Sequence, residues 1–180
     1  ARFYAPSDVA VDRTGNVYVA DFNNNTIRKI TPTGVVSTLA GKPRTGGMTD
    51  GFAEVARFWS PRDLTIDDAE NVYVADYSNR AVRKITPNGM VSTLTDFVQI
   101  IQIFGELGFG WHPSAVAMDK TGNIYASDRD LHTIWKIAAS GKPSIFAGVP
   151  GRAGSNDATG SLSRFDVPSG LSVDISCNLY

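Results

Sequence analysis

Residues 6–21 read PSDVAVDRTGNVYVAD, and this stretch recurs with substitutions along the whole chain. The copies begin at Pro6, Pro61, Pro113 and Pro168, which lie 55, 52 and 55 residues apart. A nearly fixed period of this length indicates an array of similar structural units.

Each copy opens with a short segment that alternates in residue size and ends in Asp, such as Val9-Ala10-Val11-Asp12. A period of two residues predicts a β-strand. The turn that follows ends in Gly15 in the first copy, where glycine can adopt positive φ and close a hairpin. A second strand is then predicted between an Asn and an Asp, at residues 16–21, 71–76 and 123–128.

Two more strands complete each repeat. The third is predicted at residues 27–30, 82–85 and 134–137, and the fourth at residues 36–39, 91–94 and 144–147. Pro143 begins the last of these strands, and because proline has no N–H to donate, we expect this strand at a sheet edge. Four short antiparallel strands at a fixed period, with no helical periodicity between them, are typical of the blades of a β-propeller. A stacked β-helix is the weaker alternative, because its coils are usually shorter.

The repeats divide the chain into blade repeats at residues 1–56, 57–110 and 111–163 and a partial fourth at residues 164–180. Because propellers close on about 4 to 8 blades, three and a third blades do not complete a ring. We therefore expect the 180 residues to form part of a larger all-β propeller.

Composition places the chain among ordinary globular proteins, with 42% hydrophobic and 19% charged residues and a formal net charge of -1. So balanced a charge predicts no nucleic-acid ligand, and no apolar run is long enough for membrane insertion. The single Cys177 excludes an internal disulfide framework and a multi-cysteine zinc site.

The repeated residues resemble the NHL-repeat family of β-propellers. The resemblance rests on Ala1-Arg2-Phe3 and Ala56-Arg57-Phe58 ahead of the proline, on residues 15–21, and on Ile27-Arg28-Lys29-Ile30 and its copies. The long repeats with Gly-rich linkers are similar to the bacterial and extracellular branch of that family. The resemblance implies a six-bladed ring whose members mostly bind proteins, RNA or other ligands, although related six-bladed propellers include peptide-amidating lyases and metal-dependent lactonases.

Ligands of propellers normally bind on the face where the loops between second and third strands open together with the linkers between blades. On this face the sequence predicts Asn23, Asn25, Arg80, Asp130 and His132 as ligand-binding residues. The alternative is that these are solvated residues selected for turn formation.

The recurring carboxylates Asp21, Asp76 and Asp128 are predicted to be structural, because an asymmetric site needs different residues in different blades. We expect their oxygens to accept backbone N–H groups in the loop that follows each of them. The pairs Arg28-Lys29 and Arg83-Lys84 are predicted to be solvent-facing edge charges.

Catalytic chemistry has few candidates in this sequence. His112 and His132 are the only histidines and have no metal-ligand spacing, so we predict no catalytic residue, no metal and no cofactor. Asn24-Asn25-Thr26 matches the N-glycosylation pattern, and its use is left open.

The linker at residues 97–110 departs from the others because it is apolar instead of Gly-rich. It contains Ile100, Ile101, Ile103 and Phe104, which we predict to form an interaction surface. The segment either folds over the outer strands of its own blade as an extra edge element or meets a partner chain or neighbouring domain. Ile101 and Ile103 would share a face if it were extended.

These observations predict a non-catalytic propeller segment that binds a protein, peptide or glycan, outside the cytoplasm or at the cell surface. One alternative is part of a propeller enzyme, a lyase or hydrolase with some of its groups in other blades. Another alternative is a structural unit of a surface assembly.

The first prediction concerns the association of the isolated 180-residue chain. Its first and last blades each expose a face that a neighbouring blade covers in a closed ring, so we expect self-association instead of a stable monomer. Static light scattering measures this, and a cooperative, well-folded monomer would contradict it.

Overall fold

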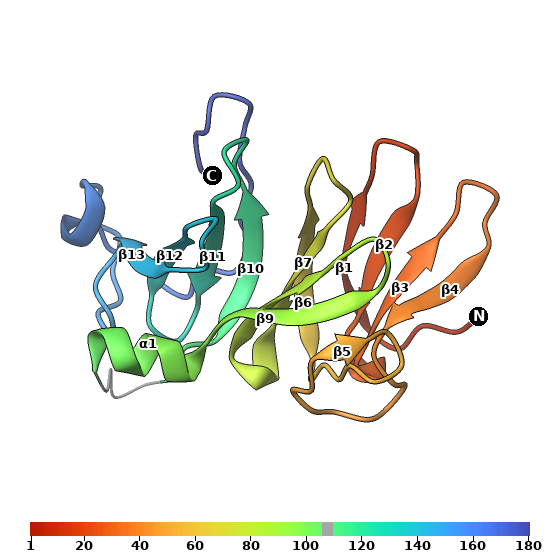
Figure 1. Ribbon diagram of the computed structural model, residues 1–180. Coiled ribbons are helices and arrows are strands. Elements are labelled where there is room, and N and C mark those ends of the chain that lie inside the picture. The colour runs from red at the N-terminus through yellow and green to blue at the C-terminus, as the bar shows by residue number, and fades with distance from the viewer. Residues whose placement is uncertain (106–109) are drawn as a thin grey trace. The chain divides into compact units, whose positions relative to one another are not determined.

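The computed structural model describes residues 1–105 and 110–180, except for the side chains of residues 103 and 104. The chain divides into two compact units, Ala1–Leu94 and Thr95–Tyr180. Each unit is built on antiparallel sheets (Figure 1).

The first unit holds two sheets, each belonging to one blade. Blade 1 has the strand order β1-β2-β3-β4, with β1 at Pro6–Val11, β2 at Val17–Asp21, β3 at Thr26–Ile30 and β4 at Val36–Ala40. Blade 2 has the order β5-β9-β8-β7-β6, with β5 at Gly51–Phe52, β6 at Pro61–Ile66, β7 at Val72–Asp76, β8 at Ala81–Ile85 and β9 at Met90–Asp96. Two short 3-10 helices follow the second strands, η1 at Phe22–Asn24 and η2 at Tyr77–Asn79.

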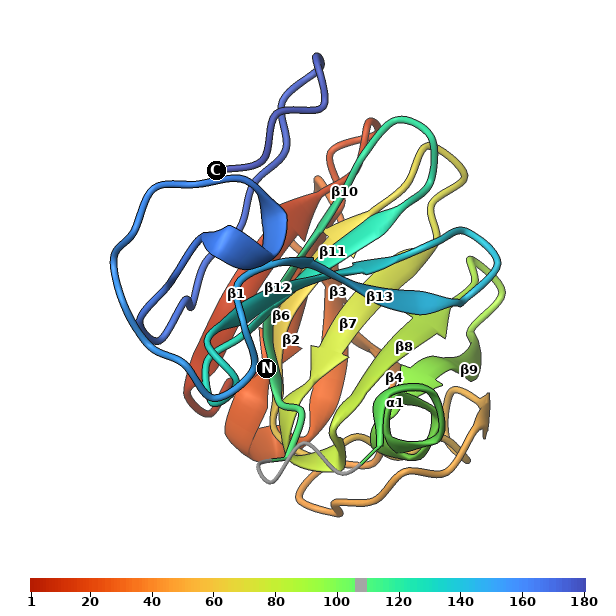
Figure 2. The ribbon, with the colours of Figure 1, turned by 90° about the vertical axis from the view of Figure 1, so that its left-hand side faces the viewer.

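The second unit holds blade 3 and the linkers on either side of it. Its strand order is β10-β11-β12-β13, with β10 at Pro113–Met118, β11 at Ile124–Asp128, β12 at Thr133–Ile137 and β13 at Pro143–Ala147. Helix α1 spans Phe97–Phe104 and is seen nearly end-on in Figure 2, and η3 spans Gly160–Leu162. Within the described residues, no helix has the length and apolar character required to span a membrane.

The predicted fold class, all-β propeller blades of four antiparallel strands, is confirmed, and blade 2 carries β5 as a fifth strand. The first two strands pair in the same register in every blade, as Val9↔Val19, Leu64↔Val74 and Val116↔Ala126 show. Pro143 lies on the edge strand, as predicted. The boundaries of the blade repeats stay predictions.

An aspartate closes the first hairpin of each repeat. Both oxygens of Asp12 accept hydrogen bonds from Thr14 and Asn16, and Oδ2 also accepts from the hydroxyl of Tyr18. Partial burial acts against ionisation, but the hydrogen bonds from Asn16 and Thr14 outweigh it and hold the pKa of Asp12 well below its usual range. The same arrangement surrounds Asp67, Asp119 and Asp174.

Within the linker at residues 97–110, residues 97–104 form a helix where we expected none. Asp96 caps α1 by accepting the N–H of Gln99 at 2.9 Å. Phe97, Ile100, Ile101 and Phe104 are spaced three and four residues apart, which is the period of an amphipathic helix. An extended edge element is therefore the wrong description of residues 97–104.

The partial fourth repeat forms a hairpin without regular strands. Ser172 and Tyr180 exchange backbone hydrogen bonds, and Val173 and Leu179 form one isolated bridge. Ile175 at the turn is 90% exposed. Two short strands alone bury too little apolar surface to make a stable sheet.

Blades 1 and 2 are joined along their first strands. The hydroxyl of Ser7 donates to the carbonyl oxygen of Pro61 at 3.2 Å, and a carboxylate oxygen of Asp8 accepts the N–H of Leu64 at 2.9 Å. Leu64 is only 4% exposed, whereas Val9 at the equivalent position of blade 1 is 58% exposed. Within this unit, the strand face that carries Val9 in blade 1 is therefore exposed, whereas the equivalent face of blade 2 is buried.

A glycine after the fourth strand is required by a close backbone contact. A Cβ at Gly41 would lie 2.6 Å from the carbonyl oxygen of Asn25, and Gly148 has the same relation to His132. Both glycines have positive φ, +95° and +89°.

We expect Gly41→Ala to destabilise the first unit by about 1–3 kcal/mol more than Gly34→Ala. Gly34 is the matched control because its φ is similarly positive, at +82°, but a Cβ at this position would meet no described atom within 4 Å. Urea unfolding of the two variants measures the difference. Equal unfolding midpoints would show that the backbone at Asn25 moves away from the added Cβ with little loss of stability.

Candidate functional site

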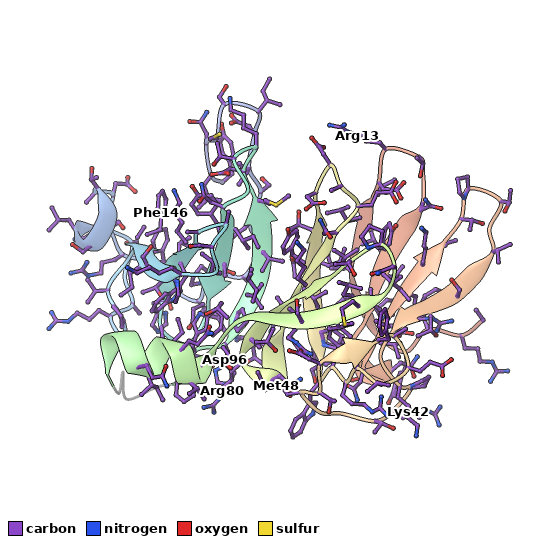
Figure 3. The ribbon with its side chains drawn as sticks, viewed as in Figure 1. Arg13, Lys42, Met48, Arg80, Asp96 and Phe146 are labelled. Atoms are coloured by element: carbon purple, nitrogen blue, oxygen red, sulfur yellow. The ribbon has the colours of Figure 1, made fainter. Side chains whose placement is uncertain are left out.

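The loops between second and third strands lie at the end of the first unit opposite the hairpin turns. In Figure 3, Arg13 marks the hairpin end, whereas Arg80 lies at the other end with Lys42 and Met48 from the linker. The expectation that these loops share a face with the linker is thus confirmed for this unit.

The predicted variable position in these loops has one backbone conformation in all three blades. Asn25, Arg80 and His132 adopt left-handed φ values of 57°, 53° and 56°. Oδ1 of Asn25 accepts the N–H of Ser60 at 2.8 Å, and Nδ1 of His132 accepts the N–H of Val167 at 3.1 Å. Both side chains therefore hold the entry of the next repeat.

The other predicted ligand-binding residues lie close to these loops. Asn23 is exposed, and its N–H donates to the carbonyl oxygen of Tyr4. Arg80 is half-buried, and Asp130 pairs with His112. Ligand binding by all five residues stays a prediction.

The recurring aspartates are structural, as we predicted, but the predicted backbone N–H groups of the following loop bind only Asp128, from Asp130 and Leu131. For Asp21 and Asp76 that loop contributes the side-chain amides of Asn24 and Asn79 instead. Asp21, Asp76 and Asp128 are fully buried. Their carboxylates accept the N–H groups of Tyr4 at 2.8 Å, Trp59 at 2.8 Å and His112 at 3.2 Å, which lie just before the first strand of each blade. Each aspartate therefore ties the end of the second strand to the entry of its own blade.

The prediction that Arg28 and Arg83 are solvent-facing is wrong. Arg83 is 0% exposed and forms ion pairs with Asp76 at 3.0 Å and Asp50 at 2.6 Å. Arg28 pairs with Asp21 at 3.3 Å. For Arg83 the sequence could not show this, because Thr49 and Asp50 of the linker cover the outward side of its strand.

The lysines beside these arginines contact aromatic rings. The ammonium groups of Lys29 and Lys84 lie 5.2 Å and 5.6 Å from the ring centroids of Tyr18 and Tyr73. These distances are within the range of cation–π attraction.

Blade 3 replaces the arginine with Trp135. In blade 2 the guanidinium of Arg83 lies over the ring of Phe58, 5.2 Å from its centroid. In blade 3 the fully buried Trp111 meets Trp135 edge to face, with ring centroids 6.3 Å apart. A buried aromatic pair has replaced an arginine–aromatic pair.

Asp128 is consequently buried without the guanidinium that faces Asp76 in blade 2. Burial raises the pKa of Asp128 to about 7, and the charge of Asp130 adds to this, although the N–H groups of Leu131, Asp130 and His112 oppose it. Burial also raises the pKa of Asp76, to about 6, although Asn79, Trp59 and Arg83 favour its ionised form.

A histidine–carboxylate pair lies next to Asp128. Nδ1 of His112 is 2.8 Å from Oδ2 of Asp130 and 2.9 Å from the carbonyl oxygen of Gly110. The N–H groups of both His112 and Asp130 donate to Asp128. The imidazole of His112 and the carboxyls of Asp128 and Asp130 are thus held together in the third blade. In the described part of the chain, no group of three His, Cys, Asp or Glu side chains is placed to hold a metal ion.

The structure adds one exposed position that the sequence analysis missed. Tyr4 and Trp59 are 57% and 54% exposed, although each follows the phenylalanine that packs under the arginine of its blade. Asp166 takes this place in the fourth repeat, and His112 takes the corresponding hydrogen-bonding role in blade 3. The signal in the sequence was a varying residue directly after Ala-Arg-Phe.

The predicted interaction surface falls on α1. Ile100 is fully buried and Ile101 is half-buried, whereas the side chains of Ile103 and Phe104 lie outside the described residues. Gln99 and Gln102 line a groove of about 260 Å³ with residues 140–143 of the β12–β13 turn. Contact of the helix with a partner stays a prediction.

Comparison with known families supports the resemblance seen in the sequence. The family model described as NHL repeat matches residues 3–30. A protein named SUPPRESSOR OF QUENCHING 1, chloroplastic, from Arabidopsis thaliana is 34% identical over 84 residues, which are 46% of this chain and 8% of that protein.

Solved propeller structures share the fold at low sequence identity. A catalytically inactive virginiamycin B lyase from Staphylococcus aureus has a TM-score of 0.64 at 12% identity, over 99% of this chain and 49% of that chain. An auxiliary nutrient binding protein from Bacteroides ovatus has a TM-score of 0.59 at 23% identity, over 76% of this chain and 37% of that chain. This chain thus spans half or less of these two structures and a small part of the curated relative.

The environment of Asp128 predicts a pH dependence of stability. Its pKa in the folded chain, about 7, lies above the ordinary value of 3.8, so folding favours the protonated carboxyl. The resulting stability is fully present below about pH 4 and is lost as the pH rises towards about 7. We expect wild-type protein to lose a few kcal/mol relative to Asp128→Asn over this interval.

Urea unfolding of both proteins at pH 4.5 and pH 7.5 measures this change. Asp157→Asn, which removes an exposed linker carboxyl, is the control for loss of one charge. If wild type and Asp128→Asn lose the same stability over this interval, Asp128 titrates as an ordinary carboxyl.

Proposed function

Because the chain is built from NHL-type propeller blades, we propose that it is a non-catalytic binding scaffold whose linker-side face holds a protein, peptide or glycan. The observation that carries this proposal is the exposure of Trp59 on a rigid turn. More than half of this side chain is exposed, while its N–H is fixed by Asp76 and its carbonyl oxygen accepts the N–H of Ser78.

An exposed tryptophan with a fixed backbone is suited to recognition. Covering its large apolar ring with a ligand lowers the free energy of the complex. The tryptophan loses little conformational freedom on binding, because its backbone is already ordered. Tryptophan and tyrosine are enriched among the residues that dominate binding energy. A guanidinium–aromatic pair adds a second binding element on the same blade, since Arg62 lies 5.2 Å from the ring centroid of Tyr77.

The repeating frame allows each blade to present a different side chain. Buried aspartates fix the same backbone positions, and these positions carry Tyr4 in blade 1, Trp59 in blade 2 and His112 in blade 3. Variation on a constant frame is the pattern expected of a recognition surface. The proposal includes an extracellular or cell-surface location, as the long repeats suggest.

A second candidate is a hydrolase or lyase site centred on His112. The pair of His112 with Asp130, next to a carboxyl whose pKa is raised to about 7, supplies groups for general acid–base catalysis. The propeller structures to which this chain is similar include a lyase and a binding protein, and the fold by itself favours neither. If His112 is the centre of a catalytic site, His112→Gln would abolish turnover of a bound ester or lactone, whereas His132→Gln would not.

Trp59 also provides the readout for a binding test, because Trp111 and Trp135 are fully buried. We expect peptides or oligosaccharides selected on defined arrays to quench its fluorescence on titration. Trp59→Ala should weaken binding about 30-fold, which corresponds to a loss of about 2 kcal/mol of binding free energy.

Val35→Ala is the matched control, since Val35 is exposed on the same unit but lies at the β3–β4 turn. Equal affinity of Trp59→Ala and wild type would exclude Trp59 from the site. Absence of binding to every peptide and glycan tested would count against the scaffold proposal itself.

A further inference from the structure

The linker between blades 1 and 2 covers one face of the Trp59 indole. A Cβ built on Gly46 would lie 3.2, 3.3 and 3.4 Å from Cγ, Cδ1 and Cδ2 of Trp59. Nearly equal distances to three bonded ring atoms place Gly46 above the plane of the indole, because Cβ of Trp59 itself blocks an approach to Cγ within the plane. More than half of Trp59 is exposed, so the open part of the side chain includes the opposite face of the ring.

The linker that backs the indole is itself fixed. The N–H of Gly47 donates to the carbonyl oxygen of Phe58 at 3.3 Å, and the side-chain amide of Asn79 donates to the carbonyl oxygen of Gly47. All of these residues belong to the first unit, and the linker between its two blades is described throughout. The indole therefore forms a flat aromatic platform with a fixed support beneath it.

A polar group with two donors lies beside this platform. Oδ1 of Asn25 accepts the N–H of Ser60 at 2.8 Å, so the amide lies next to the peptide bond between Trp59 and Ser60. Nδ2 of an asparagine carries two N–H groups. Within the described part of the chain, no acceptor binds Nδ2 of the half-buried Asn25.

The backbone around the platform is already hydrogen-bonded. The N–H of Trp59 donates to Asp76, its carbonyl oxygen accepts the N–H of Ser78, and the N–H of Ser60 donates to Asn25. Peptides that add a strand are held largely by backbone hydrogen bonds, and these groups have none left to offer. Side chains that anchor a protein partner enter packed pockets, whereas the indole presents a flat surface.

A pyranose ring complements such a surface. When its hydroxyl groups are equatorial, the sugar ring presents a flat array of C–H groups, and the hydroxyl groups project from its rim. The C–H groups carry a small positive partial charge and are attracted to the negative face of an aromatic ring. The hydroxyl oxygens at the rim can accept hydrogen bonds from amide N–H groups.

We propose that Trp59 and Asn25 form a glycan-binding subsite, in which one pyranose ring stacks on the open face of the indole and its hydroxyl oxygens accept hydrogen bonds from Nδ2 of Asn25. This inference rests on the scaffold function proposed above, and it selects a glycan over a protein or peptide as the ligand.

The probes are chitohexaose and cellohexaose, in which every sugar ring has equatorial substituents. We expect at least one of them to bind the 180-residue chain saturably and to change the fluorescence of Trp59. The NMR signals of the sugar ring C–H protons should move upfield, because the ring current of the indole shields nuclei above its face.

Substitutions of Trp59 separate stacking from simple apolar contact. Trp59→Leu should weaken sugar binding about 10-fold, whereas Trp59→Phe, which keeps an aromatic face, should weaken it only about 3-fold. Val35→Ala, at an exposed apolar position of the β3–β4 turn, is the control and should bind like wild type. Because Trp59 is more than half exposed, we expect the urea midpoints of its variants to stay near that of wild type.

An isosteric change tests the amide. Asn25→Asp keeps an oxygen for the N–H of Ser60, and aspartate tolerates the positive φ of this position, but both N–H donors are lost. We expect sugar binding to weaken about 5-fold, as for the loss of one hydrogen bond. Asn88→Asp, in the exposed β8–β9 turn, is the control for the added negative charge and should bind like wild type.

Absence of saturable binding of both sugars would overturn the proposal, and so would equal binding by Trp59→Leu and wild type. Undiminished binding by Asn25→Asp would overturn the role of Asn25. A peptide that binds at Trp59 when neither sugar does would overturn the glycan assignment while the scaffold proposal stands. Absence of both peptide and sugar binding would count against the two proposals together.

Discussion

Each blade depends on one buried carboxylate at the end of its second strand. Asp21, Asp76 and Asp128 accept backbone N–H groups from the entry of their own blades, and these hydrogen bonds offset the cost of burying the carboxyl groups. Because the entry segment is held in this way, the residue beside it can be large and exposed. The exposure of Trp59 follows from this constraint.

Blades 1 and 2 pair this carboxylate with an arginine, whereas blade 3 does not. Blade 2 surrounds Asp76 with Arg83, and Arg83 in turn requires Asp50 from the linker. Blade 3 has no arginine at this place, and the pKa of Asp128 is raised accordingly. Blade 3, with Trp135 in place of arginine, therefore differs in three features. Its core holds an aromatic pair, its preceding linker forms a helix, and its buried Asp128 has a raised pKa.

The linkers are structural elements of the blades. Residues 41–58 and 148–165 make matching backbone hydrogen bonds, for example from Gly47 to Phe58 and from Gly154 to Phe165. In blade 2 such a linker completes the sheet and buries a cation.

Much of the fold was determined by the sequence alone, because strand periodicity, the Asp and Gly of each hairpin and the repeat spacing are local signals. The structural role of Asp21, Asp76 and Asp128 also followed from their recurrence. Only the tertiary structure decided that Arg83 is buried, since its partner Asp50 lies 33 residues earlier in the chain. The exposure of Trp59, the helical form of residues 97–104 and the meeting of His112 with Asp130 were likewise decided there, because each depends on which surfaces other segments cover and not on the order of residues within one strand.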